Sequence, residues 1–283
     1  MNRRSFIKKS FLGAVGITAL TGLYTWQIEP HWLEFVRVKM PVKNLSDTLV
    51  GKTLMQISDL HSGSRVSTNY LIESLQKAKR YNPDFVVYTG DYITVSEGEV
   101  LYEQLQTVIK NSVKGTYATI AILGNHDYGI GWADPDVADN ICQIFSAEKI
   151  QVLRNESFEV NGLVFTGLDD LWAKKLDAEK AFKTYDNTKA NIVLCHNPDA
   201  CDLDIWNDHQ GWILSGHTHG GQCKPPFLPP PVLPVRNKTY TAGKFHLSEG
   251  RTLYINRALG HSLKVRFNVR PEITIFELEK EIT

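Results

Sequence analysis

Short apolar runs alternate with amphipathic helical patterns over the first half of the chain. Each apolar run ends in a polar motif, and in the segment that follows the first run Leu71, Leu75 and Ala78 recur at helical spacing. The predicted strands are 53–59, 85–91 and 118–127, and the predicted helices are 67–81, about 97–111 and 134–149. This alternation predicts parallel strands with helices packed outside them.

Strand patterns dominate the second half. Asn161-Gly162 separates two short apolar runs and predicts a hairpin. The other predicted strands are 33–42, 191–199, 211–219, 252–256 and 272–279. The segment 224–237 holds six prolines and predicts a stiff extended loop. We therefore expect an α/β fold: a four-layer αββα sandwich of two packed mixed sheets flanked by helices, with a site on loops at the strand ends.

The first 28 residues have the charge and hydropathy pattern of a targeting segment and not of a folded domain. Arg3-Arg4 precede an uncharged apolar stretch of 16 residues, Phe11 to Trp26, which is typical of a twin-arginine export signal. A spanning helix usually needs about 20 residues, and no Ala-x-Ala site follows, so a cleaved signal and a retained anchor both stay open. We predict a signal or anchor at 1–28, a connecting segment and first strand at 29–51, and a catalytic domain at 52–283.

This signal predicts recognition by the twin-arginine export machinery and a location across the cytoplasmic membrane, either anchored or in the periplasm or cell envelope. The formal net charge is zero, and 27 basic against 31 acidic residues follow Ile28, so the composition argues against a nucleic-acid partner. The four cysteines have no paired-motif spacing, and we expect mostly free, buried thiols.

The segment 216–222, Gly-His-Thr-His-Gly-Gly-Gln, places two histidines one residue apart directly after an apolar run. Alternate residues of an extended segment point to the same side, so His217 and His219 are expected to aim at one small volume, as in a metal pocket. A glycine-rich turn with two solvated histidines is the alternative.

Four further polar motifs end predicted strands, at the sheet edge where α/β folds usually bind ligands. Taken alone, His196 is typical of a core histidine and Asp91 of a turn cap. The joint pattern favours a metal site. Its residues are Asp59 and His61 in SDLHSG, Asp91 in TGDY, Asn125, His126 and Asp127 in LGNHDYG, His196 in LCHNPD, and His217 and His219.

The order of these motifs resembles the calcineurin-like metallophosphoesterases over residues 53 to about 278. Asp91 is the natural bridge between two metal ions, because it is an acid with no neighbouring basic residue. The resemblance implies that Asp59, His61 and His219 complete one metal site and that Asn125, His196 and His217 complete the other. It also assigns His126 as the general acid, which we expect Asp127 to orient.

Hydrolysis of a phosphate ester needs a nucleophile at neutral pH, neutralisation of phosphoryl charge and a proton for the leaving group. Two divalent ions about 3.5–4 Å apart supply the first two, and mixed oxygen and imidazole ligands suit Mn, Fe or Zn. We therefore expect a metal-dependent phosphoric ester hydrolase.

The C-terminal part and the export signal resemble an exported or membrane-associated bacterial branch similar to UDP-2,3-diacylglucosamine hydrolases. This implies a phosphodiester or pyrophosphate substrate, lipid-linked or a cell-wall precursor. Arg257 and Arg266 are expected to contact a second phosphate or a headgroup. A phosphomonoesterase or nucleotidase, and a non-catalytic metal-binding scaffold, are the alternatives.

Overall fold

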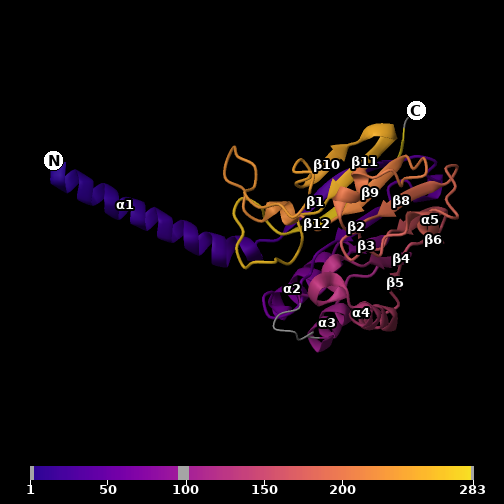
Figure 1. Ribbon diagram of the computed structural model, residues 1–283, viewed down its shortest axis with the longest axis horizontal. Helices are drawn as coiled ribbons and strands as arrows, with labels where there is room; N and C mark the ends of the chain where they lie inside the picture. Colours follow the sequence, from indigo (N-terminus) through magenta and orange to yellow (C-terminus); the bar gives the residue numbers. More distant parts are fainter. Residues whose placement is uncertain (1–2, 95–101, 282–283) are drawn as a thin grey trace.

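Two six-stranded sheets packed face to face form the body of the molecule (Figure 1). The computed structural model describes residues 3–94 and 102–281. The first sheet has the order β1 (Glu34–Val42), β12 (Glu272–Lys280), β2 (Thr53–Ile57), β3 (Phe85–Thr89), β4 (Ala118–Ile122) and β5 (Gln151–Val152). Its neighbours are parallel except for the antiparallel pair β12–β2.

The second sheet has four central parallel strands and an antiparallel strand at each edge. Its order is β10 (Gly243–His246), β11 (Arg251–Ile255), β9 (Gly211–Ser215), β8 (Ala190–Leu194), β7 (Leu163–Gly167) and β6 (Glu156–Val160). The pair β6–β7 is the hairpin predicted at Asn161-Gly162, with Val160 opposite Leu163. The edge strands β5 and β10 were not predicted, because two and four residues are too short to show a period.

The apolar faces of the sheets and helices determine how they pack into layers. Phe85, Phe165 and Phe276 pack between the two sheets in a fully buried core. The helices α2 (Thr68–Lys79), α3 (Tyr102–Lys110) and α4 (Pro135–Ala147) cover the outer face of the first sheet. The helix α5 (Ala178–Ala181) and the 3₁₀ turn Pro198–Asp202 cover the second sheet. The predicted four-layer α/β sandwich is confirmed, although its fourth layer is thin.

The helices begin where their start signals lie. Ser67 precedes α2, whose buried Leu71, Leu75 and Ala78 form one face. The Asp134 carboxylate caps α4 by accepting the backbone N–H of Asp136, and Pro135 occupies the first turn. Of the helix predicted around 97–111, the part before residue 102 lies outside the described residues.

The helix α1 (Arg3–Leu23) projects from the body of the molecule and buries none of its residues (Figure 1). It continues through a π-helical turn, Tyr24–Ile28, into the 3₁₀ turn Glu29–His31. By length and composition, the helical stretch Arg3–His31 could cross a membrane, a test that signal sequences also meet.

The proline-rich segment 224–237 contains neither helix nor strand, as predicted. Pro230 lies against Gly221, which brings this loop beside the 216–222 motif. Of the four cysteines, all of which are free, Cys195 and Cys201 are buried and Cys142 and Cys223 are half-buried.

Candidate functional site

The five polar motifs meet at one edge of the two-sheet core. They follow β2, β3 and β4 in the first sheet and β8 and β9 in the second, and each motif lies at the carboxyl end of its strand. The side-chain amide of Gln56 on β2 holds the sheets together there. Its Nε2 donates to the Ser215 carbonyl oxygen at 2.9 Å and to Thr89 Oγ1 at 3.1 Å.

A first cluster combines one carboxylate and two imidazoles, all buried. His219 Nε2 lies 3.3 Å from Asp59 Oδ1 and 3.0 Å from His61 Nε2. One oxygen or nitrogen from each of these three residues lies within 4.8 Å of the others, a spacing that could hold a metal ion.

A second cluster lies directly beside the first. His196 Nε2 is 3.1 Å from Asp91 Oδ2 and 3.2 Å from His217 Nδ1, and these three residues also form a potential metal-binding group. Asp91 Oδ2 lies 3.8 Å from His61 Nε2 of the first cluster. The Asp91 carboxylate therefore stands between the two clusters.

Asn125 follows β4 and is buried, and both polar atoms of its side chain are without a hydrogen-bond partner among the described residues. An unsatisfied buried amide costs about 1–3 kcal/mol, so such a group normally serves a ligand. An amide oxygen is an acceptable ligand for a divalent cation.

Backbone conformation in this region is unusual. Asp59, His61, Asp91, His217 and His219 all have positive φ, between 48° and 69°. Non-glycine residues seldom adopt this left-handed conformation, and such strain gathers at functional sites.

The 216–222 segment differs from the prediction. β9 ends at Ser215, Thr218 is helical and the two histidines are left-handed, so the segment is a tight turn and not an extended strand end. The turn directs His219 to the first cluster and His217 to the second. The expectation that both histidines aim at one small volume through strand alternation is therefore wrong in its geometry.

Two glycines allow the loops to approach one another. A Cβ on Gly216 would collide with Ser58 Oγ and Asp59 Oδ2, and a Cβ on Gly124 would collide with the Asp91 carboxylate. The close approach matters because the backbone N–H of His217 then donates to the Asp59 carboxylate, at 3.1 Å from Oδ1.

The electrostatics of the clusters favour cation binding. Burial and the neighbouring His219 hold the pKa of His61 well below its usual value, and burial and His196 lower the pKa of His217 to about 3. Burial alone would raise the pKa of Asp91, but His196 and His126 outweigh it and hold that pKa well below normal. Burial would lower the pKa of His196, but Asp91 outweighs it and raises that pKa well above its usual value. His61 and His217 are therefore neutral and Asp91 is ionised, as metal ligation requires, and a bound cation would displace the proton from His196. The residues therefore fit a pair of divalent cations.

Hydrogen bonds outside the clusters fix the imidazoles, and the sequence analysis missed them. Thr94 Oγ1 lies 2.8 Å from His61 Nδ1, the Thr89 carbonyl oxygen lies 2.7 Å from His196 Nδ1, and Asn197 Nδ2 lies 3.3 Å from His217 Nε2. The Thr89 carbonyl accepts the ring N–H of His196, and such an acceptor sets ring orientation and raises ligand basicity. The Asn197 amide is a donor and only positions the His217 ring. Only Asn197 had a signal in the sequence, its position next to His196.

His126 is half-buried, and its ring meets the His61 ring edge-on at 5.1 Å between centroids. Its backbone N–H donates to Asp91 Oδ1 at 2.9 Å. The residue thus lies at the mouth of the clusters with its ring close to them.

The expectation that Asp127 orients the His126 ring is wrong. The Asp127 carboxylate is fully buried and accepts the backbone N–H groups of Asp91, Tyr92 and Gly124 at 2.8–2.9 Å. Asp127 therefore ties the loop after β3 to the loop after β4, and it acts on the backbone of the site.

Two tryptophans that the sequence analysis did not single out form one wall. Trp172 meets the His217 ring edge-on at 4.4 Å, and it packs on Trp132 at 4.9 Å. Trp132 in turn faces His126 at 6.4 Å. Aromatic rings here would limit the approach of water and shape the space for a substrate.

Arg257 and Arg266 do not take the expected position toward a substrate. Arg257 pairs with Glu272 and with Glu34. Arg266 is fully buried, and its guanidinium donates to the backbone carbonyls of Arg257, Ala258, Gly260 and Val269. Both arginines hold the loop that follows β11.

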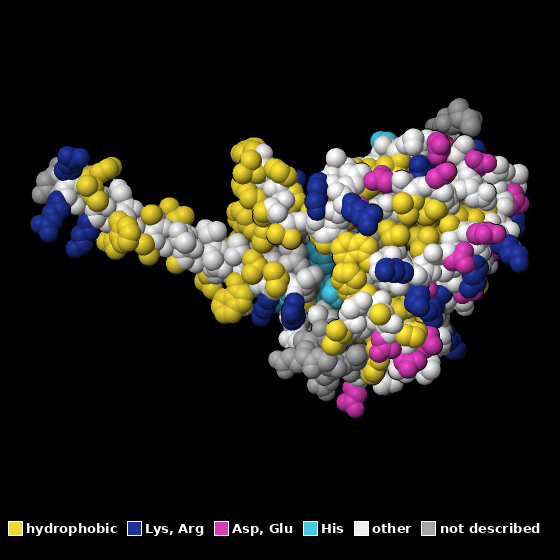
Figure 2. Space-filling model, in the orientation of Figure 1, with side chains coloured by type: hydrophobic (Ala, Val, Ile, Leu, Met, Phe, Trp, Pro, Cys, Tyr) yellow, Lys and Arg dark blue, Asp and Glu magenta, His cyan; other side chains and the backbone are white. Residues whose placement is uncertain are grey.

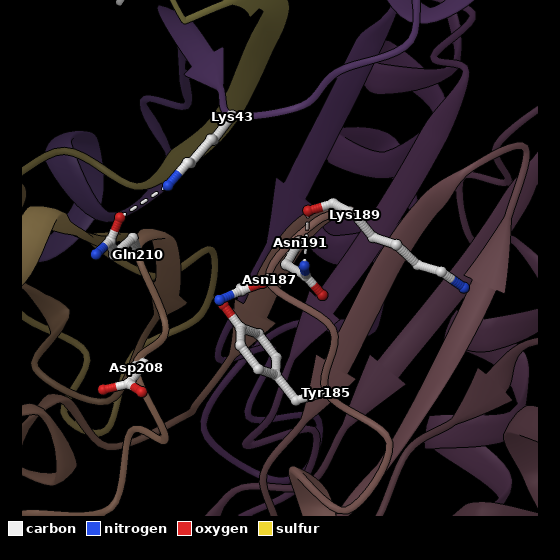
Figure 3. Close-up of a pocket in the computed structure, with 7 residues that line it drawn as sticks. All are labelled: Lys43, Tyr185, Asn187, Lys189, Asn191, Asp208 and Gln210. Atoms are coloured by element: carbon white, nitrogen blue, oxygen red, sulfur yellow. Dashed lines mark hydrogen bonds between the residues drawn. The ribbon is translucent and has the colours of Figure 1, made fainter.

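A polar cavity of about 240 Å³ lies elsewhere, at the amino ends of β8 and β9 (Figure 3). Lys43 and Gln210 join across it through a 2.9 Å hydrogen bond. None of the motif residues lines it. Ligand sites of open α/β sheets lie at the carboxyl ends of strands, so we place the functional site at the histidine clusters.

Comparison with known proteins agrees with this geometry. The sequence model of the calcineurin-like phosphoesterase family matches residues 52–221. The uncharacterized metallophosphoesterase YkuE of Bacillus subtilis is 30% identical over 99% of this chain and 98% of its own length. The UDP-2,3-diacylglucosamine pyrophosphatase LpxG of Chlamydia muridarum is 27% identical, covering 94% and 95% of the two chains. The phosphodiesterase YaeI of Escherichia coli is 28% identical, covering 96% and 98%.

Proposed function

Because this chain belongs to the calcineurin-like phosphoesterase family, we propose that it hydrolyses a phosphodiester or pyrophosphate bond with the help of two divalent metal ions. The observation that carries the proposal is the position of Asp91 between two buried His/Asp clusters. A carboxylate in that position can belong to both clusters at once.

We assign Asp59, His61 and His219 to one ion and Asn125, His196 and His217 to the other, with Asp91 shared. When bound, such ions neutralise charge on the phosphoryl oxygens and supply a nucleophile at neutral pH. The imidazole and oxygen donors suit Mn, Fe or Zn. Thr94, the Thr89 carbonyl and Asn197 keep the rings in place.

His126 is proposed as the group that gives a proton to the leaving oxygen. It is half-buried, its ring faces His61, and its backbone is tied to Asp91, so it has access both to the clusters and to solvent. The Trp132 and Trp172 wall borders the same space. Asp127 contributes by holding the loop that carries His126.

The substrate is proposed to be lipid-linked or a cell-wall precursor. This rests on the names of the relatives, one a UDP-2,3-diacylglucosamine pyrophosphatase and one a phosphodiesterase, each matching nearly the whole chain. It is also supported by the apolar N-terminal helix.

We further propose that residues 1–28 form the export signal or membrane anchor, recognised through Arg3-Arg4 by the twin-arginine machinery. In this arrangement, 29–51 is the connecting segment and first strand, and it leads into the catalytic domain at 52–283, which lies in the periplasm or cell envelope. The exposed, apolar character of α1 supports this assignment.

The purified full chain tests the reaction. It would be assayed with Mn²⁺ or with a chelator on bis(p-nitrophenyl) phosphate, p-nitrophenyl phosphate and UDP-2,3-diacylglucosamine. We expect metal-dependent cleavage that favours the diester or the UDP-lipid. Preference for the monoester would replace the proposal with a phosphomonoesterase, and bound metal without turnover on any substrate would favour a scaffold.

A further inference from the structure

Two loops beside the candidate site carry large apolar side chains into solvent. We call residues 225–235 and 262–266 the apolar rim. Phe227 is 105% exposed, Val232 is 72%, Leu263 is 65% and Leu228 is 59%. Figure 2 shows apolar side chains gathered on the loops near the inner end of α1, next to a hollow where histidine side chains are visible. Soluble monomers rarely expose such patches unless the patch meets a partner or a membrane.

The proline loop is held outward by its own structure. Its buried Leu233 and Val235 anchor the base, and Lys238 Nζ donates to both of their carbonyl oxygens at 2.7 and 2.5 Å. Pro230 packs against Gly221 of the histidine turn. Prolines fix φ and remove N–H donors, so the tip cannot fold back into a helix or strand that would cover Phe227.

The second loop is fixed to the end of the N-terminal helical segment. The backbone N–H of Arg266 donates to the Thr25 carbonyl oxygen at 2.9 Å, and Lys264 Nζ lies 5.9 Å from the centre of the Trp26 ring. The backbone N–H of Val269 donates to the buried Glu29 carboxylate at 2.6 Å. The rim and the inner end of α1 therefore form one continuous surface.

The N-terminal helical stretch is long and apolar enough to cross a bilayer. It runs from Arg3 to His31, and its uncharged part Phe11–Trp26 rises about 24 Å, toward the ~30 Å of a hydrocarbon core. Arg3 and Arg4 lie at the outer end of α1, and Trp26 lies just beyond the inner end of α1, where tryptophan commonly marks the membrane interface. A helix placed in this way would bring the rim to the same interface.

The charged side chains in the segments that carry the rim are all basic, and of these Arg257 is paired with Glu34 and Glu272. Segments 222–246 and 257–271 contain eight Lys and Arg residues and no Asp or Glu. Lys224, Arg236 and Lys264 are exposed beside the apolar side chains. Basic residues that flank an apolar surface are attracted to anionic lipid headgroups.

We propose that the apolar rim is a membrane-docking surface, which inserts Phe227, Leu228 and Leu263 into the leaflet at the inner end of α1 while Lys224 and Lys264 meet anionic headgroups. This inference rests on the proposed membrane anchor and does not depend on the proposed reaction. An apolar groove of about 400 Å³ lies between the two loops, and His219 lines it. Docking would therefore turn the opening of the candidate site toward the lipid surface.

Fluorescence quenching in vesicles tests the docking without any assay of activity. Full-length Phe227→Trp and Leu263→Trp variants would be reconstituted in phosphatidylcholine and phosphatidylglycerol vesicles, with or without lipids brominated on the acyl chains. All six native tryptophans are present in each sample, so subtraction of the unmodified protein isolates the added residue. Val50→Trp is the matched control, because Val50 is 47% exposed and lies beside the far end of β12.

We expect brominated lipid to remove most of the added emission at 227 and 263 and little of the emission at 50. The proposal is overturned if either rim position is quenched no more than position 50. It is also overturned if the rim emission shifts to the blue without quenching, since this would indicate burial against another protein molecule. Unchanged far-UV circular dichroism would show that each variant is folded.

Discussion

Asp91 is the residue on which the proposed metal pair depends. Its Oδ2 atom is near imidazoles of both clusters, and its Oδ1 atom accepts the backbone N–H of His126. The sequence identified this acid by its place after a strand. Its left-handed backbone and the approach of Gly124 show how the carboxylate reaches the gap between the clusters.

Asp91→Asn should lower metal content and activity together, because an amide keeps the shape but loses the charge that both ions share. We expect at least about a 100-fold loss of activity, since even outer-shell partners of a metal contribute 10–100-fold. Metal analysis and hydrolysis of bis(p-nitrophenyl) phosphate would measure both. Asp84→Asn is the control, because Asp84 lies at the opposite end of β3 from Asp91 and its carboxylate accepts the N–H of Thr53. Full activity in Asp91→Asn would refute the shared-ligand assignment.

His126→Gln should slow the reaction while metal content stays near normal, because His126 is proposed to donate a proton. General acid catalysis contributes about 10²–10⁴-fold. The loss should be large for an alkyl leaving group and small for p-nitrophenolate, which needs no proton to leave. Comparing kcat for the two leaving groups would measure this, and equal losses would argue for a structural role of His126 instead.

At the level of elements, the loops are placed by the strands and helices that they join. Asp127 ties the β3 and β4 loops together, and Arg266 gathers the carbonyls of the loop after β11. In that loop, the N–H groups of Leu259 and Gly260 donate to the carbonyls of Ser58 and Asp59. A buried arginine far from the motifs in sequence thus helps to hold a proposed ligand.

Arg266→Met should destabilise the protein, because it removes the donor of the Arg257, Gly260 and Val269 carbonyl groups. The Ala258 carbonyl keeps the N–H of Glu272. We expect a loss of about 2–5 kcal/mol in the free energy of unfolding. Urea denaturation of the metal-free protein would measure it. Arg236→Met is the control, since Arg236 is exposed and should change stability by less than about 0.5 kcal/mol. Equal stability of both variants would contradict the role given to Arg266.

At the level of the whole molecule, the site exists because two sheets close against each other. The first sheet supplies Asp59, Asp91 and Asn125, and the second supplies the turn after β9. The core phenylalanines between the sheets therefore stabilise the geometry of the ligands as well as the fold. Acid conditions that loosen the packing between the sheets should therefore also disturb the geometry of the candidate metal ligands.

His209 is a pH-sensitive point of this packing, away from the clusters. It is buried with its Nε2 3.4 Å from the Trp212 carbonyl oxygen, and burial lowers its pKa to about 4. Its pKa in the unfolded chain is about 6.5, so between these values the unfolded state binds more protons and stability falls as pH falls. From pH 7.5 to 5 we expect a loss of about 2 kcal/mol from this residue, and none above pH 7.5.

His209→Gln should remove this part of the pH dependence. The difference in free energy of unfolding between the unmodified protein and the variant, measured in urea at pH 7.5 and pH 5, isolates His209 because every other titrating group is common to both. An identical pH dependence in the two proteins would show that His209 has the same pKa in the folded and unfolded states, which would contradict the prediction.

The sequence by itself determined the sheet strands, the covering helices, the hairpin and the residue types of the candidate site. These are local properties: apolar periodicity, start signals and polar motifs at strand ends are written in neighbouring positions. They were sufficient to give the four-layer sandwich and the family. The short edge strands lay below the length at which a period can be read.

Only the tertiary structure decided how the site is assembled. In the structure, His217 and His219 belong to different clusters, and Asp127 binds backbone N–H groups and not the His126 ring. Arg257 and Arg266 bind groups within the protein and not a substrate. The tertiary structure also brings Thr94, Trp172 and the apolar rim beside the motifs. These contacts join residues far apart in the chain, and their geometry depends on how two sheets pack and how left-handed turns aim side chains.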